Sequence, residues 1–247
     1  MEACMKILSI GNSFSDDAQR YLRDIAAKEG VEIETLNLCI AGCSLKLHAE
    51  NIKSGAKAYF YHYNGDVERE DLITIEDGIA LRDWDIVTLQ QVSTDSFKED
   101  TYYPYLNEIA DYVRSKLPNA KIYMHQTWAY ERGCPRSFEI TDGKGAEFML
   151  EGIRSAYKRA KDEIGACAII PSAEMMELLR KADVSKIYRD TYHASLGLGR
   201  YALGLLWFKL FTGRSVLNNG FDTLDEEVRC EDLEKARMCA DSLDFIY

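Results

Sequence analysis

A serine near the start of the chain and a histidine near its end are the residues whose types and positions suggest chemistry. Ser13 stands in a Gly-Asn-Ser-Phe-Ser motif at 11–15, directly after the apolar segment Ile7–Ile10. If that segment is a strand and 16–28 a helix, Ser13 lies at a strand's carboxyl end, where open α/β sheets bind ligands. A serine there can act as a nucleophile when a base reaches it. The motif is also a common turn, in which Ser13 or Ser15 would only cap the helix.

Asp190 and His193 provide the candidate base and its partner. In a turn, a spacing of three lets the carboxylate accept a hydrogen bond from the imidazole Nδ1–H, and Nε2 stays free to face Ser13. The carboxylate would fix the tautomer and stabilise the imidazolium that forms. Alternatively, Asp190 caps the long apolar helix that we expect over 193–212.

The elements that must position these residues alternate between apolar, strand-like runs and helical patterns. Further strands are expected at 31–38, 86–89, 121–125 and 166–170, and further helices at 45–53, 105–116, 146–161, 171–180 and 225–241. Apolar strands without alternation are buried on both faces, as in a parallel sheet. The sequence therefore predicts a three-layer α/β/α sandwich of about five parallel strands with right-handed crossovers.

We expect one domain over 1–247 with a β-hairpin inserted near 56–78. Two strand-like segments, 58–63 and 72–75, flank Asn64-Gly65 and an acidic stretch. The three tyrosines of Tyr59–Tyr63 are candidates for a lid or for the contact surface of a homo-oligomer.

The composition limits the classes of partner. The chain has 247 residues, 47% of them hydrophobic, and only four prolines, which is typical of an ordinary globular protein. Its net charge of −11 argues against a general role on nucleic acid or on anionic membranes, because both present phosphates. No signal-peptide pattern precedes the first strand, and the seven cysteines form no regular framework. We therefore expect a cytoplasmic protein with reduced thiols.

Four segments together resemble the sequence blocks of the GDSL (SGNH) hydrolases. The motif at 11–15 resembles the family's Gly-Asp-Ser block, and Asp190-x-x-His193 resembles its terminal Asp-x-x-His block. Between them, Ile-Ala-Gly-Cys-Ser at 40–44 is similar to the glycine block. Asp-Ile-Val-Thr-Leu-Gln-Gln at 85–91 is similar to the strand that leads to the Gly-x-Asn-Asp block. The resemblance spans nearly the whole chain and implies a flavodoxin-like sandwich.

The resemblance also implies residue roles. Ser13 would be the nucleophile, His193 the base and Asp190 the acid that orients it. The backbone N–H groups of Ser13 and Gly42, together with one side chain from the third block, would form the oxyanion hole.

The chain departs from the family pattern at two places. Asn12 stands where the name-giving motif has Asp, a position that is not the nucleophile. The third block has no Gly-x-Asn-Asp, but a glutamine amide can donate to an oxyanion as asparagine does. We favour Gln91 as this donor, with Gln90 and Ser93 as alternatives. Asn12, Gln90 and Trp128 are candidates for binding substrate, Trp128 as a wall for a sugar ring or acyl group.

No metal or organic cofactor is expected. Cys39-x3-Cys43-x4-His48 lacks a fourth ligand, and a buried, small apolar role explains Cys39 better. The sequence therefore predicts a serine esterase that removes small acyl groups such as acetyl from a small-molecule or carbohydrate ester. The alternative is a catalytically silent protein that binds a glycan or metabolite on the same fold, which the non-standard third block favours.

Overall fold

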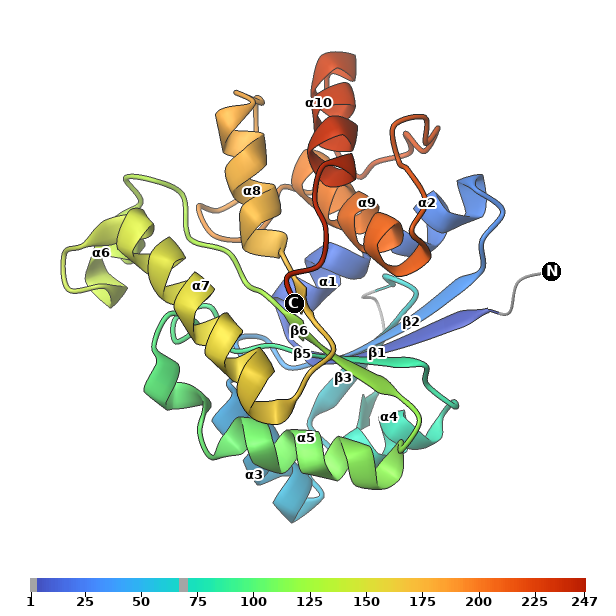
Figure 1. The fold of residues 1–247 in the computed structure, drawn as a ribbon, viewed down its shortest axis with the longest axis vertical. Helices are drawn as coiled ribbons and strands as arrows, with labels where there is room; N and C mark the ends of the chain where they lie inside the picture. Colours follow the sequence, from blue (N-terminus) through green and yellow to red (C-terminus); the bar gives the residue numbers. More distant parts are fainter. Residues whose placement is uncertain (1–3, 67–70) are drawn as a thin grey trace.

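A seven-stranded sheet forms the centre of the protein (Figure 1). The computed structural model describes residues 4–66 and 71–247. Its strands are β1 Met5–Gly11, β2 Ile33–Cys39, β3 Tyr59–Tyr63, β4 Leu72–Ile73, β5 Ile86–Leu89, β6 Lys121–His125 and β7 Ile169–Ile170. They lie in the order β4-β3-β2-β1-β5-β6-β7.

Five of these strands run parallel, as the sequence predicts. β1 pairs in parallel with β2 and β5, and β6 pairs in parallel with β5 and β7. The other two strands form the expected hairpin, since β3 is antiparallel to β2 and β4 is antiparallel to β3. The hairpin extends the sheet at one edge; residues 67–70 of the predicted 56–78 insertion lie outside the described residues.

Helices cover both faces of the sheet, which confirms the predicted three-layer sandwich (Figure 1). They are α1 Ser13–Gln19, α2 Leu22–Lys28, α3 Leu45–Ser54, α4 Ile75–Ala80, α5 Tyr105–Lys116, α6 Pro135–Ile140, α7 Gly145–Ile164, α8 Ser172–Lys181, α9 Leu198–Thr212 and α10 Cys230–Asp241. One layer contains α1, α2, α8, α9 and α10, and the other contains α3, α4, α5 and α7. Among the described residues, no helix combines the length and apolarity needed to cross a membrane.

The burial of α9 explains its apolar sequence. This helix packs against α1, α2, α8 and α10, so almost its whole circumference is covered. A helix that is hydrophobic all round is one that is buried all round. Because α9 contacts α1, it also places the residues that precede it beside the N-terminal end of α1.

Three of the predicted helices have different bounds in the structure. The helix expected over 16–28 is two helices, α1 and α2, and the cap of α1 is Asn12. α9 begins at Leu198 rather than at 193, and α10 begins at Cys230 rather than at 225. Asp225, expected inside a helix, instead pairs with Arg20 at 2.6 Å.

Candidate active site

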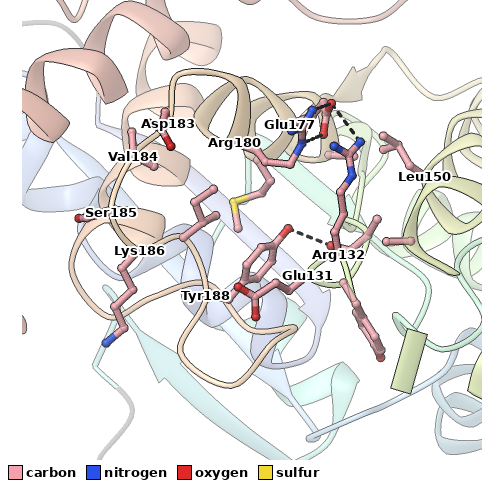
Figure 2. A pocket seen from close by; sticks show the side chains of 16 residues that line it. Glu131, Arg132, Leu150, Glu177, Arg180, Asp183, Val184, Ser185, Lys186 and Tyr188 are labelled. Atoms are coloured by element: carbon pink, nitrogen blue, oxygen red, sulfur yellow. Dashed lines mark hydrogen bonds and ion pairs between the residues drawn. The ribbon is translucent and has the colours of Figure 1, made fainter. Parts of the chain in front are cut away.

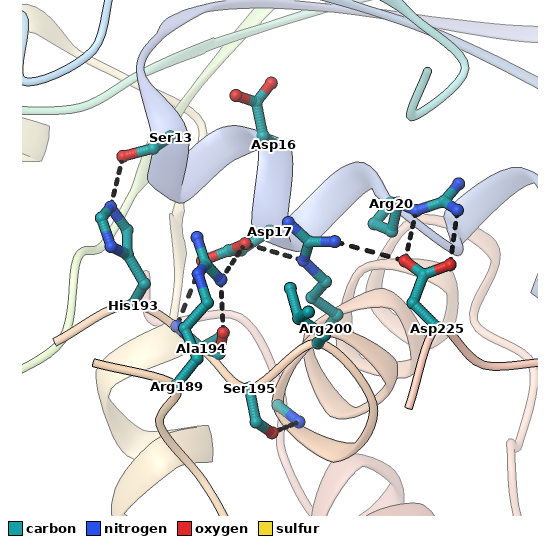
Figure 3. Close-up of polar contacts among 12 residues, drawn as sticks. Ser13, Asp16, Asp17, Arg20, Arg189, His193, Ala194, Ser195, Arg200 and Asp225 are labelled. Carbon is teal, nitrogen blue, oxygen red and sulfur yellow. Dashed lines mark hydrogen bonds and ion pairs between the residues drawn. The ribbon is translucent and has the colours of Figure 1, made fainter. Parts of the chain in front are cut away.

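Ser13, His193 and Asp190 lie in one hydrogen-bonded row where β1 passes into α1. Ser13 Oγ is 2.8 Å from His193 Nε2 (Figure 3), and His193 Nδ1 is 2.7 Å from Asp190 Oδ2. The two ends of the chain therefore bring together the three residues that the sequence analysis selected. The row is accessible, since the His193 side chain is 17% exposed and that of Asp190 is 41% exposed.

Asp190 both orients the imidazole and closes the turn that carries it. Its Oδ1 accepts the backbone N–H of His193 at 2.8 Å, while its Oδ2 faces the ring. Burial acts to raise the pKa of Asp190, but hydrogen bonds from the side chain and backbone of His193 outweigh it and hold this pKa below its ordinary value. Asp190 is therefore a carboxylate at neutral pH. No helix begins at His193, so Asp190 is not a helix cap.

Ser13 is the first residue of α1, and its neighbours perform the structural tasks of the motif. Asn12 caps the helix by accepting the Phe14 N–H at 3.0 Å. Ser15 is buried and donates its hydroxyl proton to Gln90 Oε1. Of the two serines in the motif, only Ser13 therefore faces the imidazole.

Two backbone amides, one in each of two adjoining segments, are available as donors; Asn12 Nδ2 donates to the Cys43 carbonyl at 3.3 Å and so links these segments. For the N–H groups of Ser13 and Gly42, the structure shows no partner among residues 4–66 and 71–247. Gly42 has φ of +65°, a left-handed conformation that favours glycine. Both N–H groups are therefore free to bind an oxyanion. That they form an oxyanion hole stays a prediction.

The structure places Gln91 in a different role from the predicted one. Its Nε2 donates to the carbonyl and to the hydroxyl of Thr101, each at 3.1 Å. Its Oε1 accepts the N–H groups of Leu45 and Val92. Since both polar atoms of this 1% exposed side chain are engaged, Gln91 anchors the loop after β5 and has no donor to offer an oxyanion.

The two third-block alternatives are engaged as well. Gln90 Nε2 donates to Asn12 Oδ1 at 2.6 Å, and Gln90 Oε1 faces His125 Nδ1 at 2.8 Å. The Ser93 hydroxyl lies 2.9 Å from the hydroxyl of Tyr130. Gln90 therefore supports the cap of α1 from below, and the third block forms an internal hydrogen-bond network.

The three residues predicted to bind substrate are buried, which corrects that prediction. Asn12 and Gln90 are each 1% exposed and bond to one another. Trp128 is fully buried, stacks on Phe14 with ring centroids 4.2 Å apart, and donates its indole N–H to the Tyr192 carbonyl at 2.8 Å. Trp128 is thus a support beneath the loop that carries His193.

A buried carboxylate that the sequence analysis missed ties that loop to α1. Asp17 lies one turn after Ser13, its side chain is fully buried, and its Oδ1 accepts from Arg189 at 2.8 Å and from Arg200 at 2.9 Å (Figure 3). Its Oδ2 accepts the Ala194 N–H at 3.1 Å. Asp17 therefore fixes both flanks of the Asp190–His193 turn, and the only sequence signal was an acid four residues after the candidate nucleophile.

Tyr192 covers one side of the His193 imidazole. Its ring centroid lies 4.3 Å from that of His193, and the Arg136 guanidinium lies 4.7 Å from the Tyr192 ring. Tyr192 is partly exposed, in contrast to the buried Trp128. It is the aromatic side chain beside His193 that a substrate can reach.

A separate cavity of about 500 Å³ lies behind the loop that leads to Asp190 (Figure 2). It is bounded by α7, α8 and the loop at 183–188, and none of the three catalytic candidates lines it. Its charges are largely paired, since Glu177 binds Arg180 at 2.7 Å and lies 3.6 Å from Arg132. The cavity is therefore distinct from the row formed by Ser13, His193 and Asp190.

Two other histidines are sealed in the interior. Burial lowers the pKa of His48 and of His125 to about 3, so both are neutral at physiological pH. His48 Nδ1 lies 3.0 Å from the Tyr59 hydroxyl and 3.5 Å from Cys43 Sγ. Neither histidine hydrogen-bonds to Ser13, and His62 pairs with Asp16, whereas His193 Nε2 lies 2.8 Å from the Ser13 hydroxyl.

Comparisons with known proteins agree with this architecture. The family model described as "Domain of unknown function (DUF4886)" matches residues 6–242. The chain is similar to the solved structure of a DUF4886 family protein from Bacteroides uniformis ATCC 8492, with 33% identity and a TM-score of 0.88 over 96% of this chain and 93% of that one. A comparison with curated proteins gave no match.

More distant structures share the fold. One is a provisionally assigned SGNH hydrolase from Slackia heliotrinireducens, with 20% identity and a TM-score of 0.60 over 84% of this chain and 98% of that one. Another is the acetyl xylan esterase AlAXEase, with 12% identity and a TM-score of 0.55 over 82% of this chain and 98% of that one. The chain belongs to the DUF4886 family, and its fold is that of the SGNH hydrolases.

Proposed function

We propose that the protein is a serine esterase that hydrolyses small acyl esters. The observation that carries this proposal is the continuous row of hydrogen bonds from Asp190 through His193 to Ser13, with distances of 2.7 and 2.8 Å. A hydroxyl, an imidazole and a carboxylate in this order are the arrangement that activates a serine for acyl transfer.

The reaction follows from the roles of these groups. His193 Nε2 takes the Ser13 proton as Oγ attacks the ester carbonyl, and the resulting oxyanion is stabilised by the N–H groups of Ser13 and Gly42. His193 then gives the proton to the departing alcohol, which leaves the acyl group on Ser13. Water, deprotonated by the same imidazole, attacks the acyl-enzyme and releases the acid. The Asp190 carboxylate stabilises the imidazolium in both halves of the reaction.

Packing around the nucleophile supports a short acyl group. Phe14 and Trp128 stack on each other beneath the row and are both buried, so they leave no open apolar groove between them for a long chain. The partly exposed ring of Tyr192 offers a flat face to the alcohol part, as a sugar ring would require. The acetyl xylan esterase among the structures of similar fold is consistent with an acetylated carbohydrate substrate.

A series of p-nitrophenyl esters of increasing acyl length tests this function. We expect kcat/KM to be highest for acetate and to fall with each longer chain, and we expect Ser13→Ala to remove turnover of every ester. Acetate release from an acetylated oligosaccharide tests the alcohol part separately. Equal turnover by wild type and Ser13→Ala would overturn the esterase, whereas a preference for long chains would overturn only the small-acyl part.

A further inference from the structure

Three side chains of types that bind metals lie close together at α1. None of them belongs to the row of Ser13, His193 and Asp190. They are Asp16 on α1, Cys39 at the end of β2 and His62 on β3. His62 Nδ1 is 2.8 Å from Asp16 Oδ1, and Cys39 Sγ is 3.2 Å from Asp16 Oδ2. One ligand atom from each residue lies within 4.8 Å of those of the other two.

The sheet register explains how residues far apart in the sequence meet here. β2 and β3 pair antiparallel, with Asn37 opposite His62, and Cys39 lies two residues after Asn37 on the same strand. Directly opposed residues, and residues two apart on one strand, share a face of the sheet. Cys39 and His62 therefore both project from the face that α1 covers. The spacing of Cys39, Cys43 and His48 in the sequence gave no hint of this set.

We propose that Asp16, Cys39 and His62 form a binding site for a single zinc-type transition-metal ion. A carboxylate oxygen, a thiolate sulfur and an imidazole nitrogen are the three donors that zinc takes from proteins, and three protein ligands leave a fourth position for water or substrate. Zinc–ligand bonds of about 2.0–2.3 Å place tetrahedral ligands roughly 3.2–3.8 Å apart. His62 Nδ1 and Cys39 Sγ lie 2.8 and 3.2 Å from the two different oxygens of Asp16, and one ligand atom of each residue lies within 4.8 Å of the others. We therefore expect side-chain movements of about an ångström to close the site around an ion.

The surroundings suit an ion. Asn37 Nδ2 donates to Asp16 Oδ1 at 2.6 Å, an outer hydrogen bond of the kind that orients a ligating carboxylate. The side chains of Asp16 and His62 are each 11% exposed, which leaves a path from solvent. On binding, Cys39 loses its thiol proton to solvent, and His62 coordinates through Nδ1 while Nε2 carries the ring proton. The bound ion would tie α1, which begins at Ser13, to strands β2 and β3.

Cobalt binding to the metal-free protein tests this site without any use of ester hydrolysis. We expect one Co²⁺ per chain, a thiolate-to-cobalt charge-transfer absorption, and displacement of that absorption by Zn²⁺. Cys39→Ser should abolish the absorption, and His62→Asn should weaken Co²⁺ affinity at least tenfold. Cys167→Ser, which removes an exposed thiol elsewhere, should change neither.

Thermal unfolding provides the second readout and shows whether each variant is folded. Zinc should raise the Tm of the wild type and of Cys167→Ser, because an ion that binds only the folded state stabilises it by mass action. It should leave the Tm of folded Cys39→Ser and of folded Asp16→Asn unchanged. Absence of the charge-transfer band in the wild type, its persistence in Cys39→Ser, or its loss in Cys167→Ser would overturn the proposal, whatever the outcome of the esterase measurements.

Discussion

The row formed by Ser13, His193 and Asp190 and the third block at 90–93 both lie at the carboxyl edge of the sheet, yet their polar groups are used in opposite ways. His193 and Asp190 are partly exposed, and the row ends on the Ser13 hydroxyl. In the part of the chain that the structure describes, the backbone N–H groups of Ser13 and Gly42 have no hydrogen-bond partner. Gln90 and Gln91 are each 1% exposed, and all four of their side-chain polar atoms have partners inside the protein.

This contrast separates groups that can act on a substrate from groups that position them. A donor whose hydrogen bonds are satisfied internally must break them before it can bind an oxyanion, whereas a free backbone amide needs no such change. Gln90 supports Asn12 and so fixes the start of α1, and Gln91 holds Thr101. The third block therefore contributes to stability, and we propose the backbone N–H groups of Ser13 and Gly42 as the oxyanion donors.

Ser13→Ala should have the largest effect on activity. Loss of the nucleophile is expected to lower turnover by about six orders of magnitude, to the background that binding alone provides. The free energy of unfolding should change by less than about 0.5 kcal/mol, since the partly exposed hydroxyl contributes little to packing. Ester hydrolysis and denaturant unfolding measure the two quantities. Ser15→Ala is the matched control and should retain activity; the reverse pattern would move the nucleophile to Ser15.

Asp190→Asn should reduce turnover by about tenfold to a thousandfold, because the amide favours the wrong imidazole tautomer; the same change in serine proteases costs about four orders of magnitude. Asp24→Asn, an exposed acid on α2, is the control. Unchanged turnover would contradict the assigned role.

The effect of Asp190→Asn on the free energy of unfolding should depend on pH in a direction that the pKa shift determines. The pKa of Asp190 is lowered in the folded state, so its hydrogen bonds stabilise the protein above the ordinary carboxyl pKa and are lost only as pH falls through the lowered one. The stability difference between wild type and Asp190→Asn should therefore be largest near neutral pH and shrink in acid. Denaturant unfolding at several pH values measures it, and a difference that grows in acid would contradict the assignment.

Asp17→Asn should strongly lower the free energy of unfolding. It should also lower turnover, because His193 would be held less firmly in position. It leaves Arg189 and Arg200 without their buried carboxylate, at a cost on the order of 3 kcal/mol. In the folded fraction, kcat should fall more than tenfold while KM changes little, because the loop carrying His193 loses an anchor. Asp24→Asn serves again as the control. Loss of stability with normal kcat would limit Asp17 to a structural role.

Gln91→Met should have the smallest effect on activity and a clear effect on stability. The change removes the hydrogen bonds to Thr101, Leu45 and Val92, and we expect a loss of about 1–3 kcal/mol in the free energy of unfolding. Turnover by the folded protein should stay within about threefold. A loss of about a hundredfold or more in kcat would identify Gln91 as an oxyanion donor after all.

The features that the sequence predicted best are those that a short segment determines by itself. The strands Ile86–Leu89 and Lys121–His125 have their predicted bounds because continuous apolar runs report burial on both faces. The Asp190–His193 turn is likewise local, since three residues suffice to place the carboxylate against the ring.

The errors concern side chains whose partners lie far along the chain. Trp128 was predicted to face substrate, but its indole bonds to the carbonyl of Tyr192, 64 residues away. Gln91 was predicted to donate to an oxyanion, but its amide hydrogens bond to Thr101. Asp17 carried only a weak sequence signal, its spacing of four residues from Ser13, because its arginine partners are 172 and 183 residues distant. The exposure of a side chain and the hydrogen-bond partners around it depend on the assembled fold, and the spacing of residues in the sequence does not predict them.

Stoichiometric labelling by a fluorophosphonate tests the central claim most directly. The reagent reacts with a serine only when a neighbouring base activates it, so labelling reports the Ser13–His193 pair without requiring the natural substrate. We predict one adduct per chain in the intact mass, located on Ser13 by peptide mapping, absent in Ser13→Ala and retained in Ser15→Ala. An unlabelled wild-type protein, or an adduct on another residue, would contradict the account and favour a silent binding protein on this fold.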